Sequence, residues 1–140
     1  MAQPPSTLAA SVLVVDDEPD LRTLYELTLL REGYRVESAG SVEEGWSLLQ
    51  QRFDVVITDM RLPDGLGLAL LHGLKAQQRP ERVIVMTAYG SAENAVEALK
   101  AGAFDYLTKP VDLKQFRTVV VSAIQDTSQA ARPATNNEKA

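Results

Sequence analysis

Residues 11–20 read SVLVVDDEPD, an apolar run that ends abruptly in acidic residues. Three further runs also end at a side chain able to do chemistry: DVVIT stops before Asp59, RVIVM before Thr87 and FDYLT before Lys109. A fifth run, YRVESA at 34–39, ends without a reactive group. Short runs rich in β-branched residues predict strands that are buried on both faces of a parallel sheet.

Helical patterns separate these five strands. Pro19 suits a first helical turn, where its missing N–H costs nothing, and Ser41 with Glu44 forms a capping box. Gly102 is typical of the position just after a helix. The alternation predicts an α/β fold, a flavodoxin-like (βα)₅ three-layer sandwich with parallel strand order 2-1-3-4-5.

The pattern also predicts which side chains the later helices bury. The third helix, after the turn at 63–65, is expected to carry Leu66 with the leucines that follow it. The fourth helix, capped by Ser91, is expected to turn Val96 and Leu99 inward. The strands are expected at 11–15, 34–39, 54–58, 82–86 and 104–107, and the fifth helix at 112–125.

Length and composition indicate one domain of 140 residues with two loose ends. The expected division is a flexible start at 1–10, the domain at 11–126 and a linker or disordered tail at 127–140. A chain without cysteine has no disulfide or thiol chemistry. A net charge of −5 disfavours direct nucleic-acid binding, and the apolar runs are too short for a membrane span, so a cytoplasmic protein is expected.

The carboxyl ends of parallel strands share one sheet edge, so Asp16, Asp17 and Asp59 should converge there. Taken alone, Asp16 and Asp17 fit a helix cap and Asp59 an ordinary strand end. Together they favour a cation site, because clustered carboxylates repel one another unless a cation lies between them. Oxygen ligands suit Mg²⁺, with Mn²⁺ or Ca²⁺ as alternatives.

Two other strand ends add groups that bind anions. Lys109 would neutralise an incoming phosphoryl group, and a cis bond to Pro110 would aim its side chain across the sheet edge. Thr87 would donate a hydrogen bond from its hydroxyl. The plainer alternatives are an exposed lysine and a buried strand-end threonine. With a carboxylate nucleophile, the set is that of a phosphoryl-accepting aspartate.

The motifs VVDDEPD, ITDMRLPDG, VMTAYGS and FDYLTKPVD, in this order over 11–125, resemble the receiver domain of two-component response regulators. The resemblance implies a domain that catalyses phosphoryl transfer from a sensor histidine kinase to its own aspartate, and its later hydrolysis, rather than an enzyme that turns over a substrate. It implies Asp59 as the phosphoacceptor. It also implies Asp17 as a direct Mg²⁺ ligand, Asp16 as a ligand through water and the backbone carbonyl of Arg61 as a further ligand.

The resemblance further implies a switch. Thr87 and Lys109 would sense the phosphoryl oxygens, and Tyr106 would be the switch aromatic. The fourth helix, fifth strand and fifth helix would form the face that makes a homodimer on activation. Arg61 and Tyr89 stand where the family varies, and large side chains there would tune the access of water to the acyl phosphate.

Longer stretches are similar to receivers of σ54-dependent activators of the NtrC type, with a lean toward regulators of type IV pilus genes. An ATPase and a DNA-binding domain would then follow, but the chain has no GxxxxGK[ST] motif and no basic recognition helix. The linker-like tail favours an excised receiver with a transcription-activator output. A stand-alone receiver that regulates a partner protein is the alternative.

Three other function classes remain open. A flavin-binding carrier of this fold needs a loop rich in hydroxyl groups and glycine after the first strand, where DDEPD stands. An aspartate-nucleophile phosphatase usually has a second aspartate two residues on, where this chain has Arg61. A phosphate-independent interaction module would not need the acidic set with Thr87 and Lys109.

Overall fold

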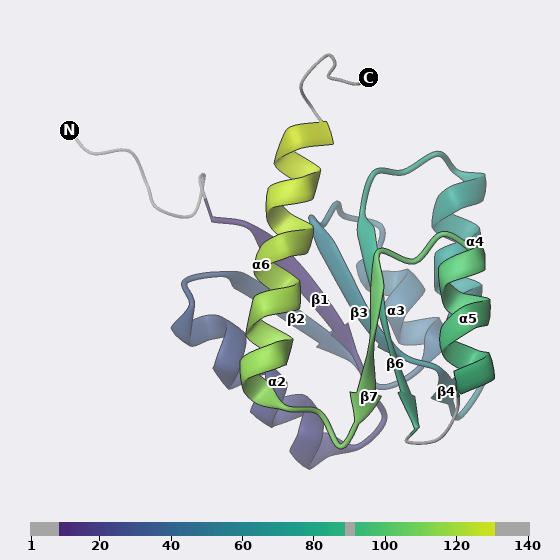
Figure 1. Ribbon diagram of the computed structural model, residues 1–140, viewed down its shortest axis with the longest axis horizontal. Helices are drawn as coiled ribbons and strands as arrows, with labels where there is room; N and C mark the ends of the chain where they lie inside the picture. Colours follow the sequence, from purple (N-terminus) through teal and green to yellow (C-terminus); the bar gives the residue numbers. More distant parts are fainter. Residues whose placement is uncertain (1–8, 89–91, 131–140) are drawn as a thin grey trace.

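The computed structural model describes residues 9–88 and 92–130. Five parallel strands form the central sheet: β1 (Ser11–Val15), β2 (Arg35–Ala39), β3 (Val55–Asp59), β6 (Arg82–Ala88) and β7 (Asp105–Lys109). Their order is β2-β1-β3-β6-β7 (Figure 1), which confirms the predicted order 2-1-3-4-5.

Helices cover both faces of the sheet (Figure 1) and complete the three predicted layers. On one face lie α2 (Pro19–Arg31) and α6 (Leu113–Ala130); on the other lie α3 (Val42–Leu48), α4 (Leu68–Ala76) and α5 (Ala92–Lys100). Pro19 begins α2, as expected. The helix α6 begins after Asp112, whose carboxylate accepts the N–H of Lys114 at 2.9 Å, and it continues past the expected end near residue 125.

Two apolar cores hold the layers together because side chains of a strand alternate between its faces. Val12 and Val14 belong to the core under α2 and α6, whereas Leu13 and Val15 belong to the core under α3, α4 and α5. All of β3 is buried, as expected for a central strand with helices on both faces. No helix in the described ranges is long and apolar enough to cross a membrane.

A short antiparallel hairpin follows β3, where the sequence predicted a turn and the start of a helix. Its strands are β4 (Arg61–Leu62) and β5 (Gly65–Leu66). The prediction that Leu66 belongs to the third helix is wrong: Leu66 lies in β5, is 42% exposed, and α4 starts at Leu68. Gly67 closes the hairpin by donating its N–H to the carbonyl of Met60 at 2.8 Å, which delays the helix.

The packing of α5 also differs from the prediction. Val96 and Leu99 are 51% and 44% exposed, whereas Ala95 and Ala98 face the sheet and are buried. Successive residues of a helix are rotated by about 100° around its axis. Because Ala95 and Ala98 contact the sheet, the neighbouring Val96 and Leu99 point toward solvent. The predicted cap at Ser91 lies outside the described residues.

The helix end predicted at Gly102 and the cap predicted at Ser41 are confirmed, but the reciprocal contact of the predicted capping box is made to Gly40 instead of Ser41. Gly102 has φ +106°, a conformation that favours glycine, and closes α5. Ser41 accepts the N–H of Glu44 at 3.1 Å at the start of α3. The carboxylate of Glu44 accepts the N–H of Gly40 at 2.6 Å, one residue before the partner that a capping box uses.

Candidate phosphoryl-acceptor site

The carboxyl edge of the sheet brings together three groups from distant parts of the chain. Asp16 follows β1, Asp59 ends β3 and Lys109 ends β7. The Nζ atom of Lys109 lies 2.7 Å from Oδ1 of Asp59 and 3.1 Å from Oδ2 of Asp16. The parallel order of the strands therefore produces the convergence that the sequence predicted.

Three carboxylates form a cluster suited to a divalent cation. Oxygen atoms of Asp16, Asp17 and Asp59 all lie within 4.8 Å of one another. Asp16 and Asp59 are buried, whereas Asp17 is exposed. Hard oxygen donors that leave one side open to water fit Mg²⁺, which keeps several waters when bound to proteins.

The backbone of the hairpin offers a fourth oxygen. Hydrogen-bonded and non-hydrogen-bonded residue pairs alternate in an antiparallel ladder. The N–H of Gly67 bonds to the carbonyl of Met60, so the next pair, Arg61 with Leu66, is a non-hydrogen-bonded one. The carbonyl of Arg61 is therefore directed away from the partner strand, which is compatible with its expected role as a metal ligand.

Asp16 is fixed by its surroundings. Its Oδ1 accepts the N–H of Glu18 at 2.8 Å, and its Oδ2 pairs with Lys109. Its main-chain carbonyl accepts a hydrogen bond from the guanidinium of Arg22 at 2.8 Å, and its N–H donates to Ala39. Both carboxylate oxygens thus have partners, which restricts the orientation of the side chain.

Asp59, unlike Asp16, borders open space. It lines an open cavity, although only 5% of the residue is exposed. Burial raises the pKa of Asp59 to about 7, with a further contribution from the charge of Asp16, while the hydrogen bond from Lys109 acts in the opposite direction. A cation at the cluster would favour the ionised, nucleophilic form of Asp59.

Lys109 remains a cation in this environment. Partial burial lowers its pKa, but the hydrogen bond and charge of Asp59, with those of Asp16, outweigh burial and raise the pKa above its ordinary value. Glu18 adds a third carboxylate, 3.7 Å from the Nζ atom. The bond from Lys109 to Pro110 is cis, the isomer expected to aim the lysine across the sheet edge.

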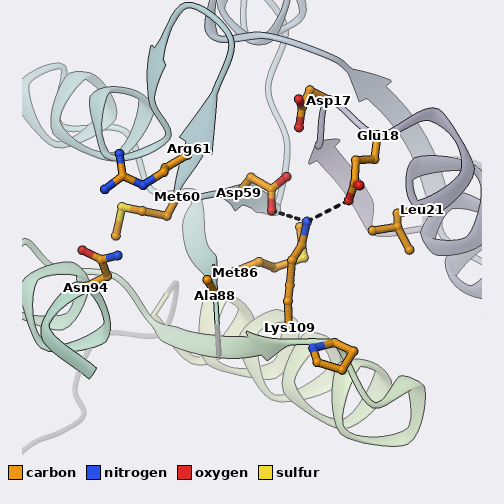
Figure 2. Close-up of a pocket in the computed structure, with 11 residues that line it drawn as sticks. Asp17, Glu18, Leu21, Asp59, Met60, Arg61, Met86, Ala88, Asn94 and Lys109 are labelled. Carbon is orange, nitrogen blue, oxygen red and sulfur yellow. Dashed lines mark ion pairs between the residues drawn. The ribbon is translucent and has the colours of Figure 1, made fainter. Parts of the chain in front are cut away.

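The cavity above Asp59 has a volume of about 520 Å³. Asp17, Glu18 and Lys109 lie on one side of Asp59 in Figure 2, and Met60, Arg61 and Asn94 lie on the other. The sequence alone did not predict Glu18, Met60 or Asn94 as part of the site. Asn94 could have been predicted from its position in the first turn of the helix after Thr87, because that turn lies at the same edge of the sheet.

The two expected switch residues lie outside the cavity lining. Thr87 is 2% exposed on β6, beside Thr108 of β7. Tyr106 is 37% exposed, so its side chain stands on the outer surface of the edge strand. Tyr89 lies outside the described residues.

Comparison with known proteins gives a consistent result. A family model described as the response regulator receiver domain matches residues 12–121. The chain is 50% identical over 114 residues to the response regulator protein PilR of Pseudomonas aeruginosa, covering 81% of this chain and 26% of that protein. It is 39% identical over 132 residues to the DNA-binding transcriptional regulator NtrC of Azospirillum brasilense, covering 93% and 27%. The chain thus spans about a quarter of the length of these curated relatives.

Solved structures show the same similarity. A response regulator receiver domain from Clostridium thermocellum superimposes with a TM-score of 0.79 at 34% identity, covering 85% of this chain and 97% of the other. The beryllofluoride-activated NtrC4 receiver domain dimer gives a TM-score of 0.77 at 32% identity, covering 84% and 98%.

Proposed function

Because this chain belongs to the response regulator receiver domain family, we propose that it accepts a phosphoryl group on Asp59 from the phosphohistidine of a sensor histidine kinase. One observation carries the proposal: a nearly buried carboxylate lies at the floor of an open cavity, with an ammonium 2.7 Å away and two further aspartates within metal-binding range. We place the protein in the cytoplasm, where such kinases present their phosphohistidine.

Of the two buried aspartates, Asp59 is the better placed to act as the nucleophile. Both oxygens of Asp16 have partners and Asp16 does not line the cavity, whereas Asp59 does. A carboxylate oxygen of Asp59 attacks the phosphorus as the P–N bond to the donor histidine breaks, and the bonding electron pair stays on the ring nitrogen, which takes up a proton. Lys109 neutralises charge on the phosphoryl oxygens throughout the transfer.

A divalent cation completes the site in this proposal. Asp16, Asp17, Asp59 and the carbonyl of Arg61 would hold it, and Mg²⁺ fits best, with Mn²⁺ or Ca²⁺ as alternatives. When bound, it supplies positive charge to phosphoryl oxygens that the acidic cluster would otherwise repel. The chain's own contribution is to hold the four oxygens and Lys109 in place.

Phosphorylation would then change one face of the domain. The new group adds a charge of about −1.5 to −2 and draws the hydroxyl of Thr87 toward it. Tyr106 then rotates inward, and the face formed by α5, β7 and α6 repacks for a two-fold homodimer. We propose that this dimer controls an attached σ54-dependent transcription activator, and the similarity to NtrC and PilR supports the proposal. The alternative is a stand-alone receiver that regulates a partner protein.

The test is phosphoryl transfer from a ³²P-labelled histidine kinase. The protein should acquire label that is released by hydroxylamine, and Asp59→Asn should acquire none because the amide is not a nucleophile. Asp20→Asn, which removes an exposed carboxylate in the first turn of α2, is the control and should label normally. Label retained by Asp59→Asn would refute the assignment. Repeated turnover of a simple phosphate ester would instead support a phosphatase.

A further inference from the structure

The tip of the hairpin that follows Asp59 is bound to a helix from another part of the chain. Asp64 lies in the turn between β4 and β5. Its Oδ1 accepts the N–H of Val42 at 2.8 Å, and its Oδ2 accepts the N–H of Glu43 at 3.0 Å. A carboxylate that accepts two N–H groups at a helix N-terminus makes charge-assisted hydrogen bonds and favourable contact with the helix dipole.

This contact divides the capping of α3 between two residues. Ser41, which the sequence predicted as the cap, accepts the N–H of Glu44. Asp64, more than twenty residues away in the sequence, accepts the N–H groups of Val42 and Glu43. The two caps therefore act on the same helix end, but only the contact of Asp64 also connects α3 to the hairpin.

The base of the hairpin is fixed at the phosphoryl-acceptor site. A Cβ atom at Gly67 would clash with the carbonyl oxygen of Asp59, so the two backbones are in close contact there. The N–H of Gly67 bonds to Met60 at 2.8 Å. Arg61 lies between this base and the tip, with its carbonyl directed out of the ladder.

We propose that Asp64 is a positioning residue for the divalent-cation site: by binding the hairpin tip to α3, it holds the carbonyl of Arg61 where the cation needs it. This inference rests on the proposed function, which supplies the cation. The hairpin has only two residues in each strand, and isolated hairpins are marginal in water. An anchor at the tip therefore restricts the motion of everything between tip and base.

Linkage makes the effect reciprocal. If the anchor strengthens cation binding, bound cation must strengthen the anchor by the same free energy. Titration with Mg²⁺ should then slow hydrogen exchange at the amides of Val42 and Glu43, although α3 contributes no ligand. That protection should disappear in Asp64→Ala.

The decisive experiment is calorimetric titration with Mg²⁺ alone of the wild-type protein, Asp64→Ala, Asp64→Asn and Ser41→Ala. Asp64→Ala should weaken Mg²⁺ binding by about tenfold, the lower end of the range for residues that support metal ligands. Asp64→Asn keeps one acceptor oxygen and should lie closer to the wild type. Ser41→Ala removes the other cap of α3 and should bind Mg²⁺ like the wild type.

Unchanged Mg²⁺ affinity in Asp64→Ala would overturn the inference. So would equal weakening in Ser41→Ala, because Asp64 would then act only by stabilising α3. Circular dichroism and the thermal midpoint of each variant establish that it is folded at the titration temperature. If the wild-type protein itself does not bind Mg²⁺, the proposed function fails, and that result is distinct from either outcome above.

Discussion

At the scale of single residues, buried carboxylates occur at two places within residues 9–88 and 92–126 and serve a different purpose in each. At the carboxyl edge, Asp16, Asp59 and Lys109 form the site. Elsewhere, Glu81 pairs with Arg79 at 2.6 Å with its side chain fully buried. This second pair was not predicted, because Arg79 and Glu81 lie outside the motifs and only the fold buries them.

The pair between Arg79 and Glu81 joins neighbouring loops. Glu81 accepts the N–H of Phe53 at 3.0 Å, and Arg79 donates to the carbonyl of Leu49 at 2.6 Å. Arg79→Met should cost about 3–5 kcal/mol of unfolding free energy, because it leaves the Glu81 carboxylate buried without its partner. Urea denaturation measures this loss.

A half-exposed pair provides the control for Arg79→Met. Asp126 lies 2.7 Å from Arg82, and both side chains are about a third exposed. Asp126→Asn should cost less than about 1 kcal/mol. Equal losses for the two variants would show that burial of the Arg79 pair has no energetic consequence.

The acceptor carboxylate should make stability depend on pH when no divalent cation is present. Burial raises the pKa of Asp59 from 3.8 to about 7, so the folded state binds more protons than the unfolded state between these values. Stability therefore falls as the pH rises through this window. The amide in Asp59→Asn does not ionise, so this variant does not lose stability as the pH rises. It should have a larger unfolding free energy than the wild type at pH 8 in EDTA, as measured by urea denaturation.

The same comparison has two internal checks. The advantage of Asp59→Asn should shrink as the pH is lowered from 7 toward 4, because the folded wild type then keeps its proton and the unfolded carboxyl also becomes increasingly protonated. Saturating Mg²⁺ should stabilise the wild type more than the variant, since binding to the folded state adds stability. An advantage that does not change with pH would argue against a raised pKa.

At the scale of elements, small residues decide how helices sit on the sheet. The helix α5 uses Ala95 and Ala98 for its contact, and this choice leaves Val96 and Leu99 on the surface. Hydrophobicity alone predicted the opposite face. The sequence signal was ambiguous because the larger side chains have the same helical spacing as the alanines, and only the close approach of α5 to the sheet selects the smaller pair.

Substitutions in α5 should therefore reverse the usual ranking. Ala98→Leu should cost about 1–3 kcal/mol or more, because a larger side chain has no room at a fully buried position. Leu99→Ala should change the unfolding free energy by about 0.5 kcal/mol or less. Chemical denaturation of both variants measures the difference, and a larger loss in Leu99→Ala would contradict the observed orientation.

At the scale of the whole molecule, exposed large apolar side chains of the described residues lie on two separate faces, apart from Leu66 of the hairpin. Val96, Leu99 and Tyr106 lie on the face of α5, β7 and α6, while Leu27 and Leu30 lie on α2. The first face is the one that our proposal assigns to the dimer. The second is available as a matched control of similar exposure.

With beryllofluoride and Mg²⁺, the wild-type protein should shift toward a dimer in light scattering. Leu99→Asp should remain a monomer, because a charge would be buried in the interface, and Tyr106→Ala should weaken the response. Leu27→Asp, at a side chain that is 54% exposed on α2, should dimerise normally. All three should still bind Mg²⁺. Dimerisation of Tyr106→Ala at the wild-type level would exclude the switch role of Tyr106.

The sequence by itself determined the order of strands and helices and the set of reactive groups at the sheet edge. It did so because buried strands have an unmistakable composition, and because parallel topology sends every carboxyl end to one edge. The cap at Ser41, the helix end at Gly102 and the convergence of Asp16, Asp59 and Lys109 all followed from local patterns of this kind.

Only the tertiary structure decided the hairpin of β4 and β5, the inner face of α5 and the anchor from Asp64 to α3. The hairpin is local, but strands of two residues are too short to show a periodic pattern. The inner face of α5 and the anchor depend on how closely two distant segments approach, and a single sequence does not encode that distance in its local pattern. Asp64 looked like a turn residue because its partners, the N–H groups of a helix 21 and 22 residues away, exist only once the layers have packed.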